Sequence, residues 1–198
     1  MLEYELIAAY YEGKVAARSG LPYMNHIDEG LMLLKAMGAP QEALPAFCLH
    51  PIAQNGDEAE QAYAQKSPVW FYAERYALVA NCYLPQNTPP IDLPRDERRT
   101  AITAHFSQEA RHDLQDRVIT AMLFADKLQN DKDARRMGYK SHHTDQLEQY
   151  FKDWLWLIGK DKLKWNITAA TSATTQDASA YGGLKPTRPE RRIGHTQG

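Results

Sequence analysis

The sequence predicts an all-α fold, a helical bundle over residues 1–160 followed by a flexible, basic tail over residues 161–198. Apolar residues recur at the three- and four-residue spacing of a helix in several segments of the bundle. No stretch gives a convincing strand pattern, and the sequence has neither an internal repeat nor a glycine-rich phosphate loop. After Gly159 the periodicity fades. Residues 168–198 are rich in Ala, Thr, Ser, Gly and Pro, a composition that buries too little apolar surface to offset its ordering entropy.

The first two predicted helices are separated by a turn that contains a proline. The first helix runs from Leu2 to Arg18, and Pro22 disfavours helical backbone at the residue before it. The second begins at Asn25, a residue type favoured as an N-cap, and two acidic residues follow where the helix dipole favours negative charge. Its apolar stripe extends to Gly38 and consists of Ile27, Leu31, Leu34 and Met37.

The central predicted helix, residues 43–53, is apolar on all sides except at one residue, His50. A helix without a polar face lies inside the protein, so this side chain is expected to point into the core. Pro51 removes one helical hydrogen bond, and we expect a kink or an early end there. Residues 54–57, Gln-Asn-Gly-Asp, are predicted to form the following turn.

The remaining elements follow from the same spacing and from the prolines. An aromatic-rich helix is predicted over residues 68–84, and four prolines make residues 85–94 a surface loop. Residues 95–106 form a short helix, residues 108–137 a long one, and residues 147–158 a last aromatic helix.

Composition indicates an ordinary soluble protein of one domain. Of the 198 residues, 43% are hydrophobic and 24% charged, and the formal net charge of −2 gives no general attraction to nucleic acid or to an anionic membrane. From Lys160 onward seven Lys and Arg oppose three Asp and Glu, a net charge of +4. The two cysteines lie in apolar segments, and neither a secretory signal nor a membrane span is visible. We therefore expect a cytoplasmic protein.

Three side chains from separate predicted helices can form a metal site. His26 lies at the start of one helix, His50 is expected in the core, and Asp126 shares a sector of about 60° with Asn130 and three apolar residues. Buried carboxylates are nearly always paired or bound to metal. Two imidazoles and a carboxylate suit Mn, Fe or Zn, although His50 alone would be explained by a hydrogen bond to a backbone carbonyl.

Three sequence runs resemble the HD hydrolase domain of RelA/SpoT-type alarmone enzymes. Residues 18–26, R-S-G-L-P-Y-M-N-H, resemble the family's opening R-S-G-x-P-Y-x-x-H, and residues 46–50, A-F-C-L-H, stand where it has A-x-L-L-H-D. Residues 123–130, L-F-A-D-K-L-Q-N, are similar to L-A-D-R-x-x-N. The resemblance covers roughly residues 1–140. It implies an HD-type bundle and a divalent metal held by His26, His50 and Asp126. Lys14, Arg18 and Asn130 are the candidate nucleotide contacts, although any arginine on an exposed helix end would look the same in the sequence.

The sequence departs from this family at three acidic positions. The Asp of the His-Asp pair is Pro51, and the Glu-Asp pair that serves the attacking water is replaced by Gln54 and Asn55. Metal affinity is expected to fall, and the water loses its general base. Asp57 or Glu58, just beyond the turn, is the expected replacement as the catalytic acid or base.

Two classes of function remain open at this point. The first is a metal-dependent nucleotide phosphohydrolase acting on a (p)ppGpp-like or (d)NTP substrate. The second is a catalytically inactive HD-fold protein that binds a nucleotide or a protein partner, or a structural or assembly subunit. The basic tail offers a surface for a protein partner, a homo-oligomer or nucleic acid through Lys185, Arg188, Arg191 and Arg192, although a merely solvated tail is the simpler interpretation.

Overall fold

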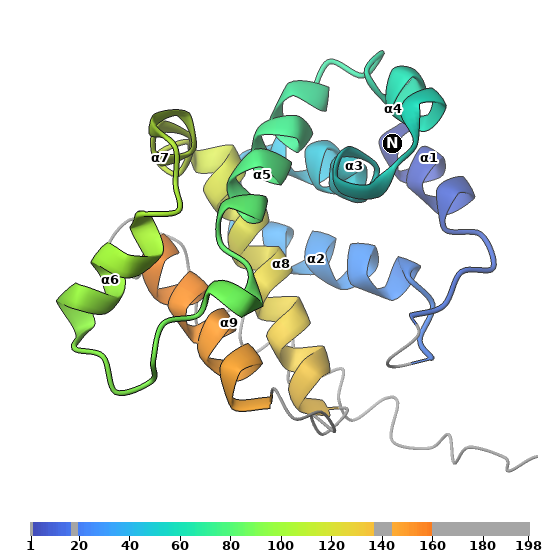
Figure 1. The fold of residues 1–198 in the computed structure, drawn as a ribbon. Coiled ribbons are helices and arrows are strands. Elements are labelled where there is room, and N and C mark those ends of the chain that lie inside the picture. The colour runs from blue at the N-terminus through green and yellow to red at the C-terminus, as the bar shows by residue number, and fades with distance from the viewer. Residues whose placement is uncertain (1, 17–19, 137–143, 160–198) are drawn as a thin grey trace, which may run out of the picture.

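The computed structural model describes residues 2–16, 20–136 and 144–159, and it confirms an all-α fold (Figure 1). Its helices are α1 (Leu2–Tyr10), α2 (Met24–Ala36), α3 (Ala43–Asn55), α4 (Glu58–Ala64), α5 (Trp70–Cys82), the 3₁₀ helix η1 (Pro85–Asn87), α6 (Arg95–Thr103), α7 (Gln108–Asp113), α8 (Arg117–Arg136) and α9 (Thr144–Ile158). The predicted tail lies outside the described residues. No helix in the described ranges is both long and apolar enough to cross a membrane.

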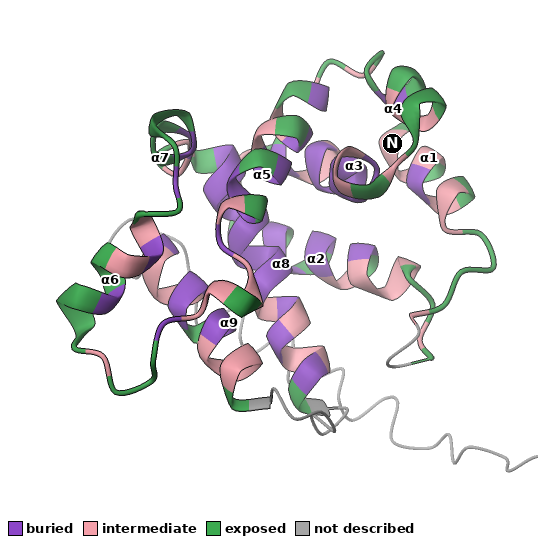
Figure 2. Cartoon of the chain, in the orientation of Figure 1, coloured by how far each residue is buried: buried purple, intermediate pink, exposed green. Residues whose placement is uncertain are grey.

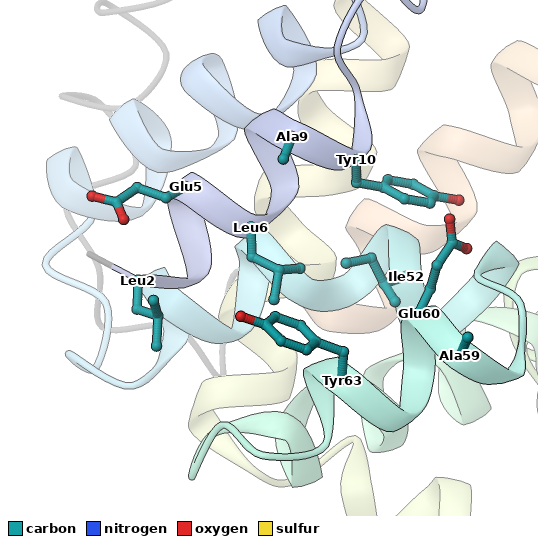
Figure 3. A pocket seen from close by; sticks show the side chains of 9 residues that line it. All are labelled: Leu2, Glu5, Leu6, Ala9, Tyr10, Ile52, Ala59, Glu60 and Tyr63. Carbon is teal, nitrogen blue, oxygen red and sulfur yellow. The ribbon is translucent and has the colours of Figure 1, made fainter.

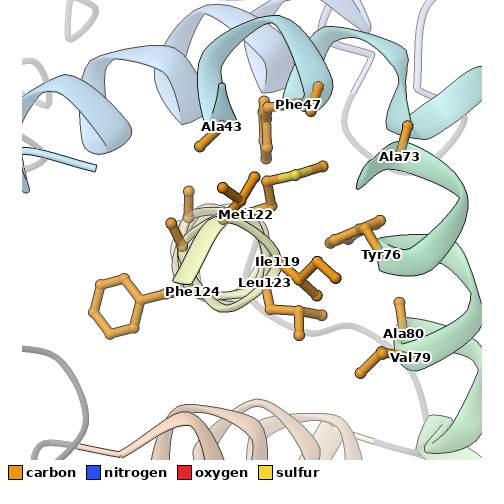
Figure 4. Packing of buried hydrophobic residues seen from close by; sticks show 14 of the residues in the cluster. Ala43, Phe47, Ala73, Tyr76, Val79, Ala80, Ile119, Met122, Leu123 and Phe124 are labelled. Atoms are coloured by element: carbon orange, nitrogen blue, oxygen red, sulfur yellow. The ribbon is translucent and has the colours of Figure 1, made fainter. Parts of the chain in front are cut away.

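Helices α3 and α8 form the centre of the bundle. Helix α8 packs against α2, α3, α5 and α9, and most of its length is buried (Figure 2). Figure 4 shows Ile119, Met122 and Leu123 of α8 surrounded by Phe47 of α3 and Tyr76 of α5. The bundle therefore brings segments that are distant in sequence around one apolar core, and the confirmed burial of α3 places its single histidine inside that core.

The first two helices have different limits from those predicted. Helix α1 ends at Tyr10 rather than at Arg18, because the chain turns through Gly13, whose φ is +68°. Helix α2 begins at Met24, and its N-cap residue Tyr23 makes no side-chain capping bond, so the prediction of Asn25 as the cap is wrong. Arg18 itself lies outside the described residues.

Helices α2 and α3 approach each other closely at Gly30. A Cβ atom built at this position would lie 2.2 Å from Cε1 of Phe47, whose side chain is fully buried. Only glycine leaves room for the ring there, and this contact sets the separation of the two helices that carry His26 and His50.

Helix α3 continues through Pro51 to Asn55, so of the two alternatives predicted there, a kink or an early end, the early end is wrong. A proline has no N–H to donate to the carbonyl four residues earlier, which here belongs to Phe47. That carbonyl oxygen instead accepts a hydrogen bond from Nδ1 of His50 at 2.6 Å. The donor that the proline lacks is thus replaced by the preceding side chain, and the helix resumes with Gly56 N bonded to Ile52 O.

Two further differences arise from aspartate caps. Helix α4 was not predicted; Asp57 starts it through a capping box with Glu60, in which each side chain accepts from the other residue's backbone N–H. The predicted helix over residues 108–137 is divided into α7 and α8, because the carboxylate of Asp116 accepts from the backbone N–H groups of Val118 and Ile119 and starts α8 anew.

The proline-rich loop after α5 is tied to the bundle by a buried ion pair. Arg98 of α6 donates from Nε and Nη2 to the carboxylate of Asp153 on α9, at 2.7 and 3.0 Å. Its remaining donors bond the backbone carbonyls of Pro89 and Pro90. Tyr83 donates to the same carboxylate, so one arginine joins the loop, α6 and α9.

A candidate metal centre between three helices

The three predicted metal ligands meet between α2, α3 and α8. The Nε2 atoms of His26 and His50 lie 3.2 Å apart, and Nε2 of His26 lies 3.3 Å from Oδ1 of Asp126. One potential donor atom from each residue lies within 4.8 Å of the others, and the histidine of α3 and the aspartate are buried. The core-facing positions predicted for His50 and Asp126 are confirmed.

Both imidazole rings are oriented by hydrogen bonds on the side away from the centre. Nδ1 of His50 donates to the carbonyl oxygen of Phe47, and Nδ1 of His26 donates to Oε1 of Gln129 at 2.6 Å. Carbonyl oxygens only accept, so each Nδ1 carries a proton, and the two Nε2 atoms turn toward each other. Two facing nitrogen lone pairs at this distance repel each other, and either a proton on Nε2 of His26 or a metal ion held by the three groups removes that repulsion. Such second-partner bonds are usual for metal-bound histidines.

The separations suit a small divalent ion. Donor atoms about 2.0–2.1 Å from a tetrahedral ion lie about 3.3 Å apart, close to the two contacts that involve Nε2 of His26. The set of two imidazoles and one carboxylate fits Mn, Fe or Zn. Beside it, the ring of Tyr76 packs edge-on against His50, and burial together with the charge of Asp126 raises the pKa of its hydroxyl well above the ordinary value.

Charge is distributed unevenly within the centre. Burial and the neighbouring His26 lower the pKa of His50 to about 3, so this ring stays neutral. Burial also lowers the pKa of His26, but the hydrogen bond and charge of Asp126 outweigh it and leave this pKa above its ordinary value. Burial opposes ionisation of Asp126, yet Lys127 and His26 hold its pKa well below the usual range. Without a metal, the shared proton therefore belongs to His26.

Lys127 is a buried member of the centre that the sequence reasoning missed. Its Nζ lies 2.7 Å from Oδ2 of Asp126, and the attraction of that carboxylate overcomes burial and raises the pKa of the lysine to about 12. One carboxylate oxygen thus pairs with a fixed cation while the other faces the histidines. Asn130, predicted as a substrate contact, donates at 2.8 Å to Oδ1 of Asp126 and orients it. The sequence signal that could have identified Lys127 is its neighbour Asp126, because a carboxylate predicted to be buried needs a cation nearby.

The centre opens into a cleft of about 250 Å³. Pro51, Gln54 and Asn55 line the cleft, so the three positions where the family motif is acidic face it as neutral side chains. Other lining residues are Tyr11, Ala16, Leu21, Pro22, Tyr23, Asn25, Gln129, Asn130 and Asp133.

Asp133 is the second carboxylate on the cleft, one turn beyond Gln129 on α8. It accepts a hydrogen bond of 2.6 Å from Nε2 of Gln129, whose Oε1 binds His26. Burial and the neighbouring Glu29 raise the pKa of Asp133. Glu29 in turn is paired with Lys132. Asp133 lies on the same face of α8 as Asp126 and Asn130, but it was not predicted as a site residue, because a carboxylate this far along the helix usually points to solvent.

The predicted catalytic acids do not line the cleft. Asp57 caps α4 with its carboxylate, and Glu58 is exposed in the first turn of that helix. Lys14 is exposed, with its Nζ 3.9 Å from the ring centre of Tyr10. Arg18 lies outside the described residues, but Ala16 and Leu21 on either side of its segment line the cleft.

Comparisons with protein-family models, with curated proteins and with solved structures find no match.

Proposed function

We propose that the chain is a metal-dependent nucleotide phosphohydrolase whose centre is formed by His26, His50 and Asp126. The observation that carries this proposal is the pair of facing Nε2 atoms, 3.2 Å apart, with each ring oriented from its far side by a carbonyl oxygen. Neutral core histidines gain nothing from such an arrangement, because two lone pairs then face each other. A bound metal ion would remove this repulsion and use both nitrogens as ligands.

Different side chains would have different roles in such a site. A divalent ion would polarise a phosphoryl oxygen and lower the pKa of a water molecule. Gln129 and Asn130 orient the donors. Asp133 faces the cleft with a raised pKa, and a carboxyl group of this kind suits general acid–base catalysis. We assign this role to Asp133 in place of Asp57 and Glu58, which lie off the cleft.

The nucleotide substrate is inferred from the family resemblance and from the cleft. Ala16 and Leu21 line the cleft, and from the family resemblance we infer that Arg18, which lies between them in the sequence, pairs with phosphate oxygens. The lining amides of Asn25, Gln54 and Asn55 can hydrogen-bond a base or a ribose. We therefore expect a (p)ppGpp-like compound or a (d)NTP.

The decisive experiment combines metal analysis with a hydrolysis screen. Purified protein incubated with excess Mn, Fe or Zn should retain about one ion per chain after dialysis, and His50→Ala should abolish retention. Phosphate or pyrophosphate release from (p)ppGpp and (d)NTPs should depend on the ion and disappear in Asp126→Ala. His112→Ala, at a side chain that is 88% exposed, is the matched control and should change neither result. A wild-type protein that retains no ion contradicts the proposal.

A binding-only protein is the second candidate, and one observation favours it. Pro51, Gln54 and Asn55 all face the cleft, and none can serve as a general base. The same screen separates the two candidates, because a binding protein should retain the ion and bind a nucleotide without turnover. If Asp133→Asn leaves binding intact and removes turnover, the enzyme is supported over the binding protein.

A further inference from the structure

A second cavity lies on the other side of α3, away from the metal centre. It is a groove of about 560 Å³ between α1, the end of α3 and α4 (Figure 3). Leu6 and Ile52 form its floor, and Tyr10 and Tyr63 point into it from opposite helices. Leu2 and Tyr63 are 66% and 57% exposed, which is unusual for side chains of this size when several gather in one place.

The groove is bordered by negative charge. Within α1 and α4 every ionisable side chain that carries charge at neutral pH is a glutamate. Glu5 and Glu60 belong to the lining itself, and the charges of Glu60 and Asp57 add to burial in raising the pKa of Tyr10. An occupant of this groove should therefore combine apolar groups with positive charge.

The chain contains a segment with this chemistry. Residues 181–193, outside the described residues, read Y-G-G-L-K-P-T-R-P-E-R-R-I and carry four basic residues against one acid. Pro186 and Pro189 are three residues apart, the repeat of a polyproline II helix, so both can face the same surface in that conformation. Proline pairs with this spacing dock into grooves lined by aromatic rings, and basic residues beside them can pair with carboxylates at the rim.

We propose that the groove between α1 and α4 binds residues 181–193 of the same chain as an extended segment. Pro186 and Pro189 would pack on Tyr10 and Tyr63, and the basic residues would lie along the glutamates. The connection permits this, since the roughly 20 residues after Gly159 have a typical coil span of about 25 Å. A folded body of this size has a radius of gyration of about 15 Å and hence a diameter of roughly 40 Å, and the same residues span up to roughly 70 Å when extended, so the segment can reach across it.

The test is photo-crosslinking in the full-length chain. We would replace Tyr63 with p-benzoylphenylalanine, irradiate, and locate the cross-link by mass spectrometry of protease fragments. We expect cross-links from position 63 to residues 181–193, in a product whose mass is that of a single chain. The matched control places the same group at Phe71, which is 55% exposed on α5 and outside the groove, and should give no cross-link to that segment.

Three variants then test the chemistry. Arg188→Glu with Arg191→Glu should lower the cross-link yield about fivefold or more, the order expected for losing two exposed ion pairs. Pro186→Ala with Pro189→Ala should lower it similarly. Glu5→Lys should lower it as well, while Glu74→Lys, on an exposed position of α5, should not.

Each remaining outcome overturns the proposal. Cross-links at twice the chain mass would show that the groove receives another copy, and cross-links to other segments would show another occupant. A yield that does not respond to any of the three variants would show a chance encounter. Circular dichroism of every variant identifies any that has lost the fold, and the surface positions chosen make that loss unexpected.

Discussion

Pro51→Ala tests how the proline inside α3 shapes the metal centre. The substitution adds a backbone N–H at the position whose helical partner is the carbonyl of Phe47. In the wild type that oxygen accepts from Nδ1 of His50 at 2.6 Å. The variant therefore makes two donors compete for one oxygen, one from the backbone and one from the ring.

The expected effects have opposite signs for stability and for metal binding. Proline within a helix destabilises the folded state by about 3 kcal/mol relative to alanine. Alanine, however, leaves the unfolded chain more flexible than proline does, which stabilises the unfolded state of the variant by about 0.4–1 kcal/mol. Pro51→Ala should therefore raise the free energy of unfolding by about 2 kcal/mol. Affinity for Mn should fall about tenfold, which is the lower end of the range observed when a metal-bound histidine loses its orienting hydrogen-bond partner. The loss should be at this lower end because the carbonyl oxygen of Phe47 has two lone pairs and can keep a weaker hydrogen bond to His50.

Urea unfolding in the presence of a chelator measures the stability, and calorimetric titration with Mn measures the affinity. Pro45→Ala is the matched control. This proline lies in the first turn of the same helix, where backbone N–H groups have no helical partner, so neither quantity should change as it does at Pro51. Equal stability and equal Mn affinity in the wild type and in Pro51→Ala would refute the role given to the Phe47 carbonyl.

Pro51→Asp provides the second comparison. It restores the same N–H and adds a carboxylate that faces the cleft, since Pro51 lines it. Mn affinity should rise above that of both the wild type and Pro51→Ala. An affinity equal to that of Pro51→Ala would mean that position 51 does not reach the ion.

Three other predictions concern stability. Arg98→Met leaves the buried carboxylate of Asp153 without its cation and should lower the free energy of unfolding by about 3–5 kcal/mol, measured by urea denaturation. Gly30→Ala places a Cβ atom against the ring of Phe47 and should cost about 1–3 kcal/mol in the same assay. The free energy of unfolding should also fall by up to about 1.4 kcal/mol per pH unit below pH 6.5, because unfolded chains protonate His50 while the folded state, with a pKa of about 3, does not.

Matched variants separate these effects from general damage. Arg99→Met removes an exposed arginine next to the buried one and should change stability by less than about 0.5 kcal/mol. If Arg98→Met is as mild, the buried pair contributes nothing. Between about pH 5 and 6.5, above the range in which carboxylates of the unfolded chain such as Asp126 become protonated, the pH effect should be absent in His50→Gln. His26, whose pKa is raised, adds no slope below its unfolded value, so a slope that persists in His50→Gln would contradict the assignment.

The apolar pattern predicts the helices that form the core, but not their ends. The aromatic stretch of α5 and the central stretch of α3 have enough apolar residues for packing to decide their conformation. Helix α4 has seven residues and one buried side chain, so its start depends on the Asp57 capping box, which a search for apolar spacing does not detect. Likewise, Asp116 starts α8 within a stretch whose residue types are all compatible with a single helix.

The donors of the candidate site were predictable, and their partners were not. His50 and Asp126 were recognisable because a polar residue within an apolar helix face needs a partner. Lys127 and Asp133 carry charges that usually point to solvent, and only the packing of α8 shows that one is buried and the other faces the cleft. Pro51 lies in an unbroken helix, and the hydrogen bond that it cannot donate is replaced by one from the side chain of His50, a contact that no local propensity describes.

The metal centre combines contacts of very different range along the chain, and this has a consequence for folding. His26 and His50 are 24 residues apart and lie on two consecutive helices, whereas the bond from His26 to Gln129 spans 103 residues. Contacts between neighbouring helices close short loops at a small entropic cost and therefore form early in folding. The docking of α8 against α2 must close a much longer loop, at a larger entropic cost. A chain whose α8 has not yet docked would hold two imidazoles without a carboxylate. The histidine pair would then exist before the site does, and the acquisition of full metal affinity would report the last docking step.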